Sequence, residues 1–204
     1  MAKDATIIGA GVSGLSTGIV LLKAGYNVHI VAKEFTPNTT SDAAAAFWFP
    51  YLCEPKDKVV EWGRYTLNYL KEYAPSDPTS GCREQNVTQM FKHPVEEPLW
   101  KDAVESYEIL TSDDLPDGYV SAYKTNSVLM DSSMYMQWLM DTFDELGGTR
   151  TEQSIQSFDE VEAEIIVNCA GLGSRELAND DKLYAVCGQV VLTDKQSVTD
   201  VVAD

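Results

Sequence analysis

The stretch ATIIGAGVSGLSTGIVLLKAGYNVHIVAKE, residues 5–34, decides the fold of this chain. It opens with a short apolar run that predicts a buried strand ending at Gly9. Beyond the glycine-rich turn, apolar side chains recur at the spacing of one helix face, at Val12, Leu15, Ile19 and Leu22. A second apolar run, residues 26–32, predicts another strand. The order strand, turn, helix and strand predicts a βαβ unit with two parallel strands.

In this context the glycine spacing is the dinucleotide-binding fingerprint. Gly9 permits the tight turn, Gly11 lets the backbone approach a pyrophosphate, and Gly14 lets the helix lie close to the strand. The N-terminus of the helix offers unpaired N–H groups and a partial positive charge to phosphates. Glu34 follows Gly14 by twenty positions, where the fingerprint expects an acid. The structural alternative is a glycine turn that only packs a helix on a sheet.

Composition and charge exclude several classes of protein and partner. The chain has 204 residues, 44% of them hydrophobic, which suffices for a sizeable core, and no apolar run approaches the ~20 residues of a membrane span. No basic region precedes the first apolar segment, as a signal peptide would require. Four scattered cysteines without a CxxC pair favour reduced thiols in a cytoplasmic compartment over disulfides or a metal site. The net charge of −17 argues against nucleic acid or an anionic membrane as a partner.

A second informative stretch is FTPNTTSDAAAAFWFPYLCEP, residues 35–55. It offers three hydroxyl groups in a row, at residues 39–41, and Asp42 is placed to cap a short helix over residues 43–46. A dense aromatic block follows over residues 47–51. This block is either core packing, which we expect for Trp48, or a wall beside a planar cofactor ring.

A third stretch, residues 164–175, carries the apolar run Ile165–Val167, which predicts a strand buried on both faces. The glycine turn NCAGLG that follows lies where open α/β sheets bind ligands. Cys169 in this turn is expected to be an inert small hydrophobe rather than a nucleophile. His29 and His93 are likewise expected to be structural.

The rest of the chain predicts a mixture of helices and short strands. Helical periodicity covers residues 56–73 and a segment from Asp131 or Ser132 to Gly147–Gly148. The expected apolar face of the first helix consists of Val59, Trp62, Leu67 and Leu70. That of the second consists of Tyr135, Trp138, Leu139, Phe143 and Leu146. Short β-like runs predict antiparallel strands over 87–91, 106–110, 119–123 and 127–130. Further strands are predicted over 154–158 and 188–192.

The segments GAGVSGLSTGI, FTPNTTSDAAAAFWFPYL and IVNCAGLGSREL, in this order, resemble the FAD-dependent D-amino-acid oxidase family. The resemblance implies an α/β fold: a Rossmann-like FAD-binding domain with a parallel sheet and an inserted, mainly antiparallel β substrate domain. The expected FAD-binding domain comprises residues 1–56 and 132–186, and the substrate domain comprises 57–131 and 187–204. The family's substrate-carboxylate arginine and last FAD-contacting glycine loop have no counterpart here, so we expect a missing C-terminal part.

The resemblance also implies which residues meet the cofactor and the substrate. The residues expected to bind FAD are Gly9, Ala10, Gly11, Val12, Ser13, Gly14, Ala32, Lys33, Glu34, Thr39, Thr40, Ser41, Ala45, Ala46, Phe47, Trp48, Ile155, Ala170 and Gly171. The residues expected to line the substrate pocket are Phe47, Phe49 and Tyr51. Lys33 stands where the family often carries an acid, which leaves open whether Lys33 or Glu34 meets the adenosine ribose. The aspartate-oxidising members carry a histidine where this chain has Tyr51.

The implied reaction is oxidation of a neutral D-amino acid to an imino acid by hydride transfer to FAD, with O2 as the final oxidant and hydrogen peroxide, ammonia and a 2-oxo acid as products. No side chain in this part of the chain is required as an acid or base, so no catalytic residue is assigned. Two alternatives stay open: oxidation of D-aspartate or another amine, and a non-catalytic nucleotide-binding fragment. We expect a cytoplasmic protein (peroxisomal in a eukaryote) and no turnover by this chain alone. Its expected partners are the missing C-terminal part or a second chain, with a homodimer as a further alternative.

Overall fold

The computed structural model describes residues 2–44, 46–50, 53–111, 115–186, 188–189, 191 and 201–203. The chain divides into two compact units, each assembled from two separate segments. The first unit comprises Met1–Ala45 and Ser132–Val191, and the second comprises Ala46–Asp131 and Leu192–Asp204. Among the described residues, no helix combines the length and the apolar character needed to cross a membrane.

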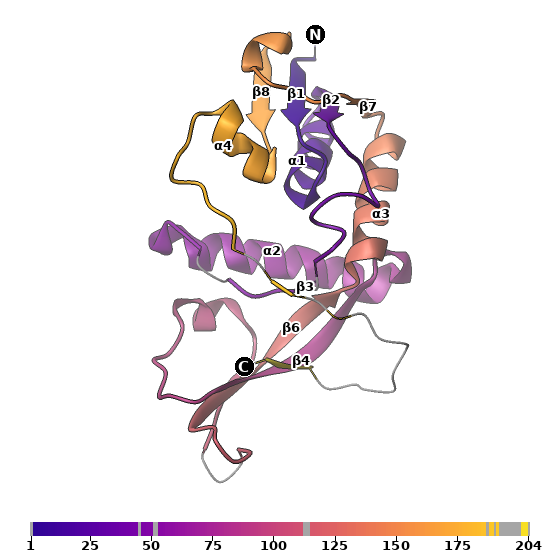
Figure 1. Cartoon of the computed structure of the whole chain (residues 1–204). Coiled ribbons are helices and arrows are strands. Elements are labelled where there is room, and N and C mark those ends of the chain that lie inside the picture. Colours follow the sequence, from indigo (N-terminus) through magenta and orange to yellow (C-terminus); the bar gives the residue numbers. More distant parts are fainter. Residues whose placement is uncertain are drawn as a thin grey trace. The chain divides into compact units, whose positions relative to one another are not determined.

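The first unit is built around a four-stranded parallel sheet. Its strands are β1 (Asp4–Ile8), β2 (Asn27–Ala32), β7 (Thr149–Glu152) and β8 (Ile165–Asn168), in the order β7-β2-β1-β8 (Figure 1). Helix α1 (Val12–Lys23) connects β1 to β2, which pair in parallel from Asp4↔Asn27 to Ile8↔Val31. The predicted strand, glycine turn, helix and strand are therefore all present. The parallel α/β sheet is confirmed.

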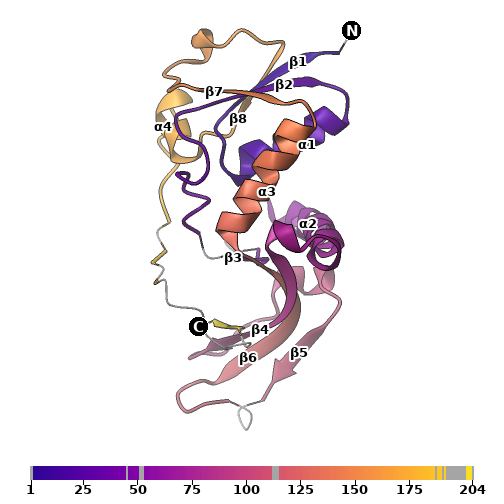
Figure 2. The same ribbon diagram turned by 90° about the vertical axis from the view of Figure 1, so that its right-hand side faces the viewer.

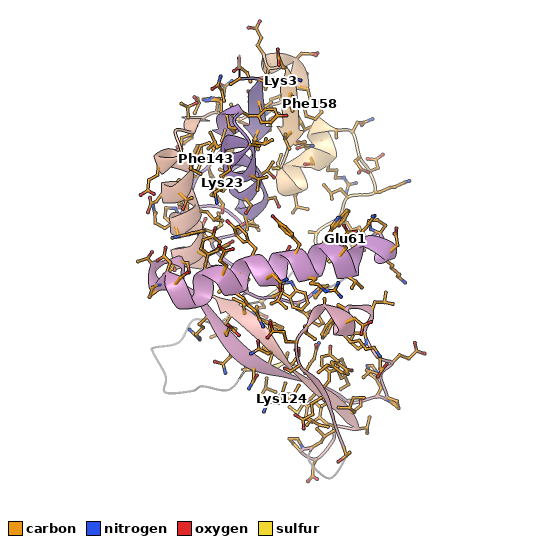
Figure 3. The ribbon with its side chains drawn as sticks, turned by 180° about the vertical axis from the view of Figure 1, so that it is seen from behind. Lys3, Lys23, Glu61, Lys124, Phe143 and Phe158 are labelled. Atoms are coloured by element: carbon orange, nitrogen blue, oxygen red, sulfur yellow. The ribbon has the colours of Figure 1, made fainter. Side chains whose placement is uncertain are left out.

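The core of the first unit lies between this sheet and two helices. Helix α3 (Ser132–Glu145) runs beside α1 (Figure 2). Phe143 of α3, labelled in Figure 3, is fully buried with Ile7, Leu15 and Ile30. Its ring lies so close to Gly18 of α1 that an added Cβ there would stand 2.8 Å from Cε2. The helices approach closely because Gly18 has no side chain.

Several predictions for the first unit are wrong, either in the residues of an element or in how deeply the element is buried. No strand forms over residues 154–158; the returning strand is β7, and Ser157 instead caps the short 3-10 helix Phe158–Glu160. The strand β8 is exposed on one face, since Ile166 is 37% accessible, whereas burial on both faces was predicted. Residues 40–43 form a turn, and the described residues of the segment 43–46 are not helical, contrary to the prediction.

The predicted apolar faces of the helices also need correction. On α1, Leu15 and Ile19 are buried, whereas Val12 is exposed at the first helical position. On α3, Met136 and Met140 are buried and Leu146, beyond the helix end, is exposed. A residue at a helix end has fewer neighbours than one in the middle, because it faces solvent or a ligand on more sides. Apolar periodicity therefore predicts burial poorly at helix ends.

The second unit is a mainly antiparallel sheet covered by one long helix. Strands β4 (Cys82–Phe91) and β6 (Ser121–Met130) pair along their whole length, from Cys82↔Met130 to Phe91↔Ser121. The other edge of β6 pairs with β5 (Tyr107–Leu110) and β3 (Ala46–Phe47). The short strand β9 (Val201–Ala203) runs parallel to β4. The predicted strands 119–123 and 127–130 thus overlap one continuous strand, which begins at Ser121.

Helix α2 (Lys56–Ser76) begins where the sequence predicts and continues slightly further. It buries Val59, Leu67 and Leu70, as predicted, while Trp62 is 55% exposed and lies outside the buried face. Short 3-10 helices at Pro78–Ser80 and Leu99–Ala103 complete the second unit. The first unit also contains the 3-10 helix Gly171–Gly173 and the short helix α4 (Ser174–Leu177). The strand predicted over 188–192 lies partly outside the described residues, and Gly188, Gln189 and Val191 are not in a strand.

An aromatic cluster forms the core of the second unit. Trp100 is buried and meets Trp48, Phe49 and Tyr123 edge to face, with centroid distances of 6.0, 5.4 and 5.4 Å. The Trp48 indole N–H donates to the carbonyl of Gly63 at 3.0 Å, so the polar atom of this buried ring is satisfied. The core role expected for Trp48 is confirmed, and Phe49 shares it.

Candidate functional site

A cleft of about 900 Å³ opens at the carboxyl ends of β1, β2 and β8 in the first unit. Its wall is formed by residues 8–13, 32–34, 39–41 and 153–156 and by parts of 168–183. This is the edge of a parallel sheet at which α/β proteins bind their ligands, because the loops and helix N-termini converge there. The volume lies at the upper end of the usual range for small-molecule sites.

The three glycines of the first turn have different physical roles. Gly9 has φ +109°, and an added Cβ would overlap the backbone carbonyl of Cys169. A Cβ at Gly14 would overlap the carbonyl oxygen of Gly9. At Gly11, in contrast, the nearest atom to an added Cβ is the Ser41 hydroxyl oxygen, at 3.0 Å. Gly9 therefore lets the first turn pack against the backbone of the turn after β8, and Gly14 lets α1 pack on the end of β1. Gly11 keeps the cleft open beside the helix N-terminus.

We expect Gly14→Ala to lower the free energy of unfolding by about 3 kcal/mol or more, because α1 must move away from β1 to relieve the overlap. Gly173→Ala is the matched control, since its φ is −62° and an added Cβ would meet only Ala170 Cβ at an ordinary 3.7 Å. Chemical denaturation of the two variants and the parent protein measures the difference. Equal stability losses in the two variants would contradict the packing role of Gly14.

The hydroxyl run lies on one side of the helix N-terminus. Ser41 Oγ accepts a hydrogen bond from the backbone N–H of Val12 at 3.0 Å, which joins residues 29 positions apart. Thr39, Thr40 and Ser41 all line the cleft. Polar groups from two distant segments thus meet where the helix presents its unpaired N–H groups.

The second glycine turn closes the opposite side of the cleft. The Asn168 side-chain oxygen accepts hydrogen bonds from the Ala170 N–H at 3.2 Å and from the Ser174 hydroxyl at 3.0 Å. Burial raises the pKa of the Cys169 thiol, and a hydrogen bond with the Thr17 side chain opposes this only in part. The thiol therefore stays protonated near pH 7 and lacks the thiolate character of a nucleophile. Cys169 contributes its backbone carbonyl to the packing of Gly9 instead.

Most of the residues expected to bind the cofactor lie together on this cleft. They are Gly9, Ala10, Gly11, Val12, Ser13, Ala32, Lys33, Glu34, Thr39, Thr40, Ser41, Ile155, Ala170 and Gly171. Gly14 is buried behind the turn and does not line the cleft. The second unit contains Ala46, Phe47, Trp48 and Phe49. The ring centroids of Phe47 and Phe49 lie 5.8 Å apart. Ala45 and Tyr51 lie outside the described residues.

The cleft also contains residues that the sequence did not indicate. Gln153, Ser154 and Gln156 follow β7, and the Gln156 amide donates to Ser154 Oγ at 2.8 Å. Beyond the second glycine turn, the other side of the cleft is lined by Glu176, Leu177, Ala178, Asp180 and Leu183. The signal for the first group was the end of a parallel strand, which was missed because the strand was predicted over 154–158 instead of 149–152.

The charge of the cleft suits a ligand held by amide dipoles. Lys33 is the one basic side chain among its described lining residues, which also include Glu34, Glu176 and Asp180. A phosphate group bound here would depend on the N–H groups of the turn and α1 and on the hydroxyl run. No three His, Cys, Asp or Glu side chains in the described part of the chain lie close enough together to hold a metal ion.

Comparisons with known proteins agree with this geometry. The family model of the DAO FAD dependent oxidoreductases matches residues 4–203. D-amino-acid oxidase of Dictyostelium discoideum is 44% identical over 192 residues, covering 91% of this chain and 56% of the relative. Human D-aspartate oxidase is 34% identical over 197 residues, covering 91% of this chain and 58% of the relative. The chain therefore spans a little over half the length of these curated relatives.

A solved structure supports the fold independently. L-amino acid deaminase from Proteus vulgaris, in a form lacking its specific insertion sequence, superimposes with a TM-score of 0.67 at 15% identity. The superposition covers 89% of this chain and 56% of the deaminase. The family resemblance expected from the three segments is confirmed, and FAD is the cofactor of this family. The chain belongs to the DAO family of FAD dependent oxidoreductases.

Proposed function

We propose that the protein binds FAD in the cleft of the first unit and oxidises neutral D-amino acids. The observation that carries this proposal is the open Gly11 turn at the N-terminus of α1, opposite the Ser41 hydroxyl, in a chain 44% identical to a D-amino-acid oxidase. An added side chain would fill the very space where a pyrophosphate approaches the helix. The cleft fits a dinucleotide in volume and in its donors.

Different residues of the cleft are proposed to contact different parts of FAD. The turn N–H groups, Thr40 and Ser41 would hold the pyrophosphate, and Lys33 or Glu34 would meet the adenosine ribose. The backbone at Ile155 would contact the adenine, and Ala170 and Gly171 would lie against the cofactor on the far side. All of these residues line one cleft. When bound, FAD supplies the two-electron acceptor for the substrate.

The residues proposed for the wall of the substrate pocket are Phe47, Phe49 and Tyr51, on the strength of the family resemblance. The D-amino acid loses its α-hydrogen as a hydride and its amine proton, and forms the imino acid. Water then hydrolyses the imine to the 2-oxo acid and ammonia. O2 takes up the two electrons and one proton of the hydride, together with the proton lost by the amine, and becomes hydrogen peroxide. The chain supplies binding and orientation in this scheme, and no described side chain is assigned as an acid or base.

The proposed function predicts peroxide release from D-alanine and none from L-alanine in the presence of FAD. Because the chain spans a little over half of its curated relatives, we propose that the substrate carboxylate is bound by the part of the family unmatched here. The assay is therefore run on the 204-residue chain alone and on the chain joined to the C-terminal part of the Dictyostelium relative. Turnover by the joined protein is expected. Rapid turnover by the chain alone would refute the assignment of the carboxylate site.

Oxidation of an acidic D-amino acid is the second candidate function. It is favoured by the 34% identity to human D-aspartate oxidase. The two candidates differ in one physical requirement, since D-aspartate brings a second carboxylate that needs a cation or several hydrogen-bond donors when buried.

A further inference from the structure

One carboxylate organises the loop that carries the hydroxyl run. Asp42 Oδ2 accepts hydrogen bonds from the Thr39 N–H at 2.9 Å and from the Thr39 hydroxyl at 2.6 Å. Asp42 Oδ1 accepts a short hydrogen bond from the Thr36 hydroxyl. The Asp42 N–H in turn donates to the Thr39 carbonyl at 3.1 Å. Both oxygens of the carboxylate therefore bind the loop that leads from β2 to the cleft.

Asp42 itself does not line the cleft, whereas the three residues before it do. The Thr39 hydroxyl gives its hydrogen to Asp42, so it has none left for a ligand. Ser41 Oγ accepts from Val12 N–H, which leaves its own hydrogen for a ligand in the cleft. Thr40 is exposed on the same wall. The three hydroxyls therefore differ in role: Thr39 fixes the loop, and Thr40 and Ser41 face the ligand.

We propose that Asp42 is a positioning residue for the cofactor. It holds residues 36–41 in the shape that presents Thr40 and Ser41 to the pyrophosphate, and it sets the Ser41 oxygen against Val12 N–H. Ordering a loop of this kind before the ligand arrives removes an entropic cost from binding. The proposal rests on the proposed function, because it takes FAD as the ligand of the cleft.

The charge of Asp42 works against this role. A carboxylate beside a phosphate site repels a dianionic pyrophosphate, and the cleft holds Lys33 as its single described cation. The benefit must therefore come from the three hydrogen bonds that Asp42 accepts rather than from its charge. Asparagine separates the two effects: its carbonyl oxygen accepts both Thr39 donors, and its amide N–H donates to the Thr36 hydroxyl oxygen.

The test measures the FAD dissociation constant of the protein, Asp42→Asn and Asp42→Ala by quenching of flavin fluorescence. We expect Asp42→Ala to weaken binding about 10- to 100-fold, because the loop loses its three hydrogen bonds. Asp42→Asn should bind within about threefold of the parent protein. Thr36→Val, which removes one bond at a residue outside the cleft, should weaken FAD binding in the same direction and by less. Thermal unfolding of each variant shows that the comparison is made between folded proteins.

A second readout needs no cofactor. In the FAD-free protein, hydrogen exchange at Val12 N–H reports whether Ser41 Oγ is in place. Asp42→Ala should speed this exchange at least about fivefold and Asp42→Asn should leave it unchanged. If Asp42→Asn is as impaired as Asp42→Ala in both measurements, or if Asp42→Ala changes neither, the positioning role is refuted. If the parent protein binds no FAD, the proposed function fails, and the exchange of Val12 still decides the role of Asp42.

Discussion

Replacing Gly11 with valine should leave the protein folded and unable to retain FAD. The added side chain projects into the cleft beside the helix N-terminus, where an approaching pyrophosphate meets the N–H groups of α1. Its Cβ would also stand 3.0 Å from Ser41 Oγ, so the hydroxyl that bonds Val12 must move. We expect an affinity loss of at least about 100-fold, equivalent to about 3 kcal/mol. Equilibrium titration with FAD measures it.

Gly188→Val is the matched control for this substitution. An added Cβ at Gly188 meets nothing within 4 Å, and the residue lies outside the cleft wall. It should bind FAD like the parent protein. The thermal unfolding midpoint of Gly11→Val should stay close to that of the FAD-free parent, since only the end of a flexible side chain must yield. Undiminished FAD binding by folded Gly11→Val would place the pyrophosphate elsewhere.

The protein should prefer D-methionine or D-alanine to D-aspartate by at least about 100-fold in kcat/KM, if Phe47, Phe49 and Tyr51 form the pocket wall. Residues 46–50 carry no basic side chain, and the Tyr51 hydroxyl is neutral near pH 7. Burying the second carboxylate of D-aspartate without a cation costs about 3 kcal/mol or more. The ratio is measured on the FAD-loaded chain joined to the C-terminal part of the Dictyostelium relative, at one pH and one salt concentration.

Phe49→Arg tests this pocket directly. Phe49 is half-buried, 5.8 Å from the ring of Phe47 and 5.4 Å from that of Trp100. If one edge of Phe49 faces the substrate, an arginine there should shift the kcat/KM ratio toward D-aspartate by about tenfold or more. Phe49→Leu is the control, because it loses a similar amount of ring packing and adds no charge. Equal or better use of D-aspartate by the joined protein without the substitution would refute the pocket assignment.

The βαβ unit could be predicted because its signals are local. The glycine spacing, the helix period and the apolar strands all lie within residues 5–34. Strand β7 gave no such signal, since Thr149–Glu152 is polar and exposed and forms only through its pairing with β2. The apolar Ile155 and Phe158 attracted the prediction to the wrong segment. An edge strand stabilised by backbone pairing carries little periodicity of its own.

Strand β6 and the Asp42 loop show two other limits. Residues 124–126 fall between two predicted strands, yet they belong to one strand that is paired with β4 on one edge and with β5 on the other. Asp42 was predicted to cap a helix that follows it, whereas its carboxylate binds the residues that precede it. Aspartate side chains bond to nearby backbone in either direction, so the identity of the residue leaves the direction open.

The candidate site was foreseen in the segments that carry glycines and hydroxyls. Most of those residues line one cleft, although they come from segments up to 162 positions apart, such as Gly9 and Gly171. Parallel pairing of β1 with both β2 and β8 brings their carboxyl ends to one edge, which explains the convergence. Whether Gln153 and Gln156 line the cleft depends on where β7 pairs with β2, so the sequence alone could not predict it.

The visible absorbance spectrum of the purified protein tests the central claim most directly. If the cleft of the first unit binds FAD, the yellow flavin absorbance follows the protein through purification or returns in stoichiometric amount on titration with FAD. NAD should neither replace the flavin nor bind in its place, although both dinucleotides share a pyrophosphate. A protein that binds NAD and no flavin would contradict the account.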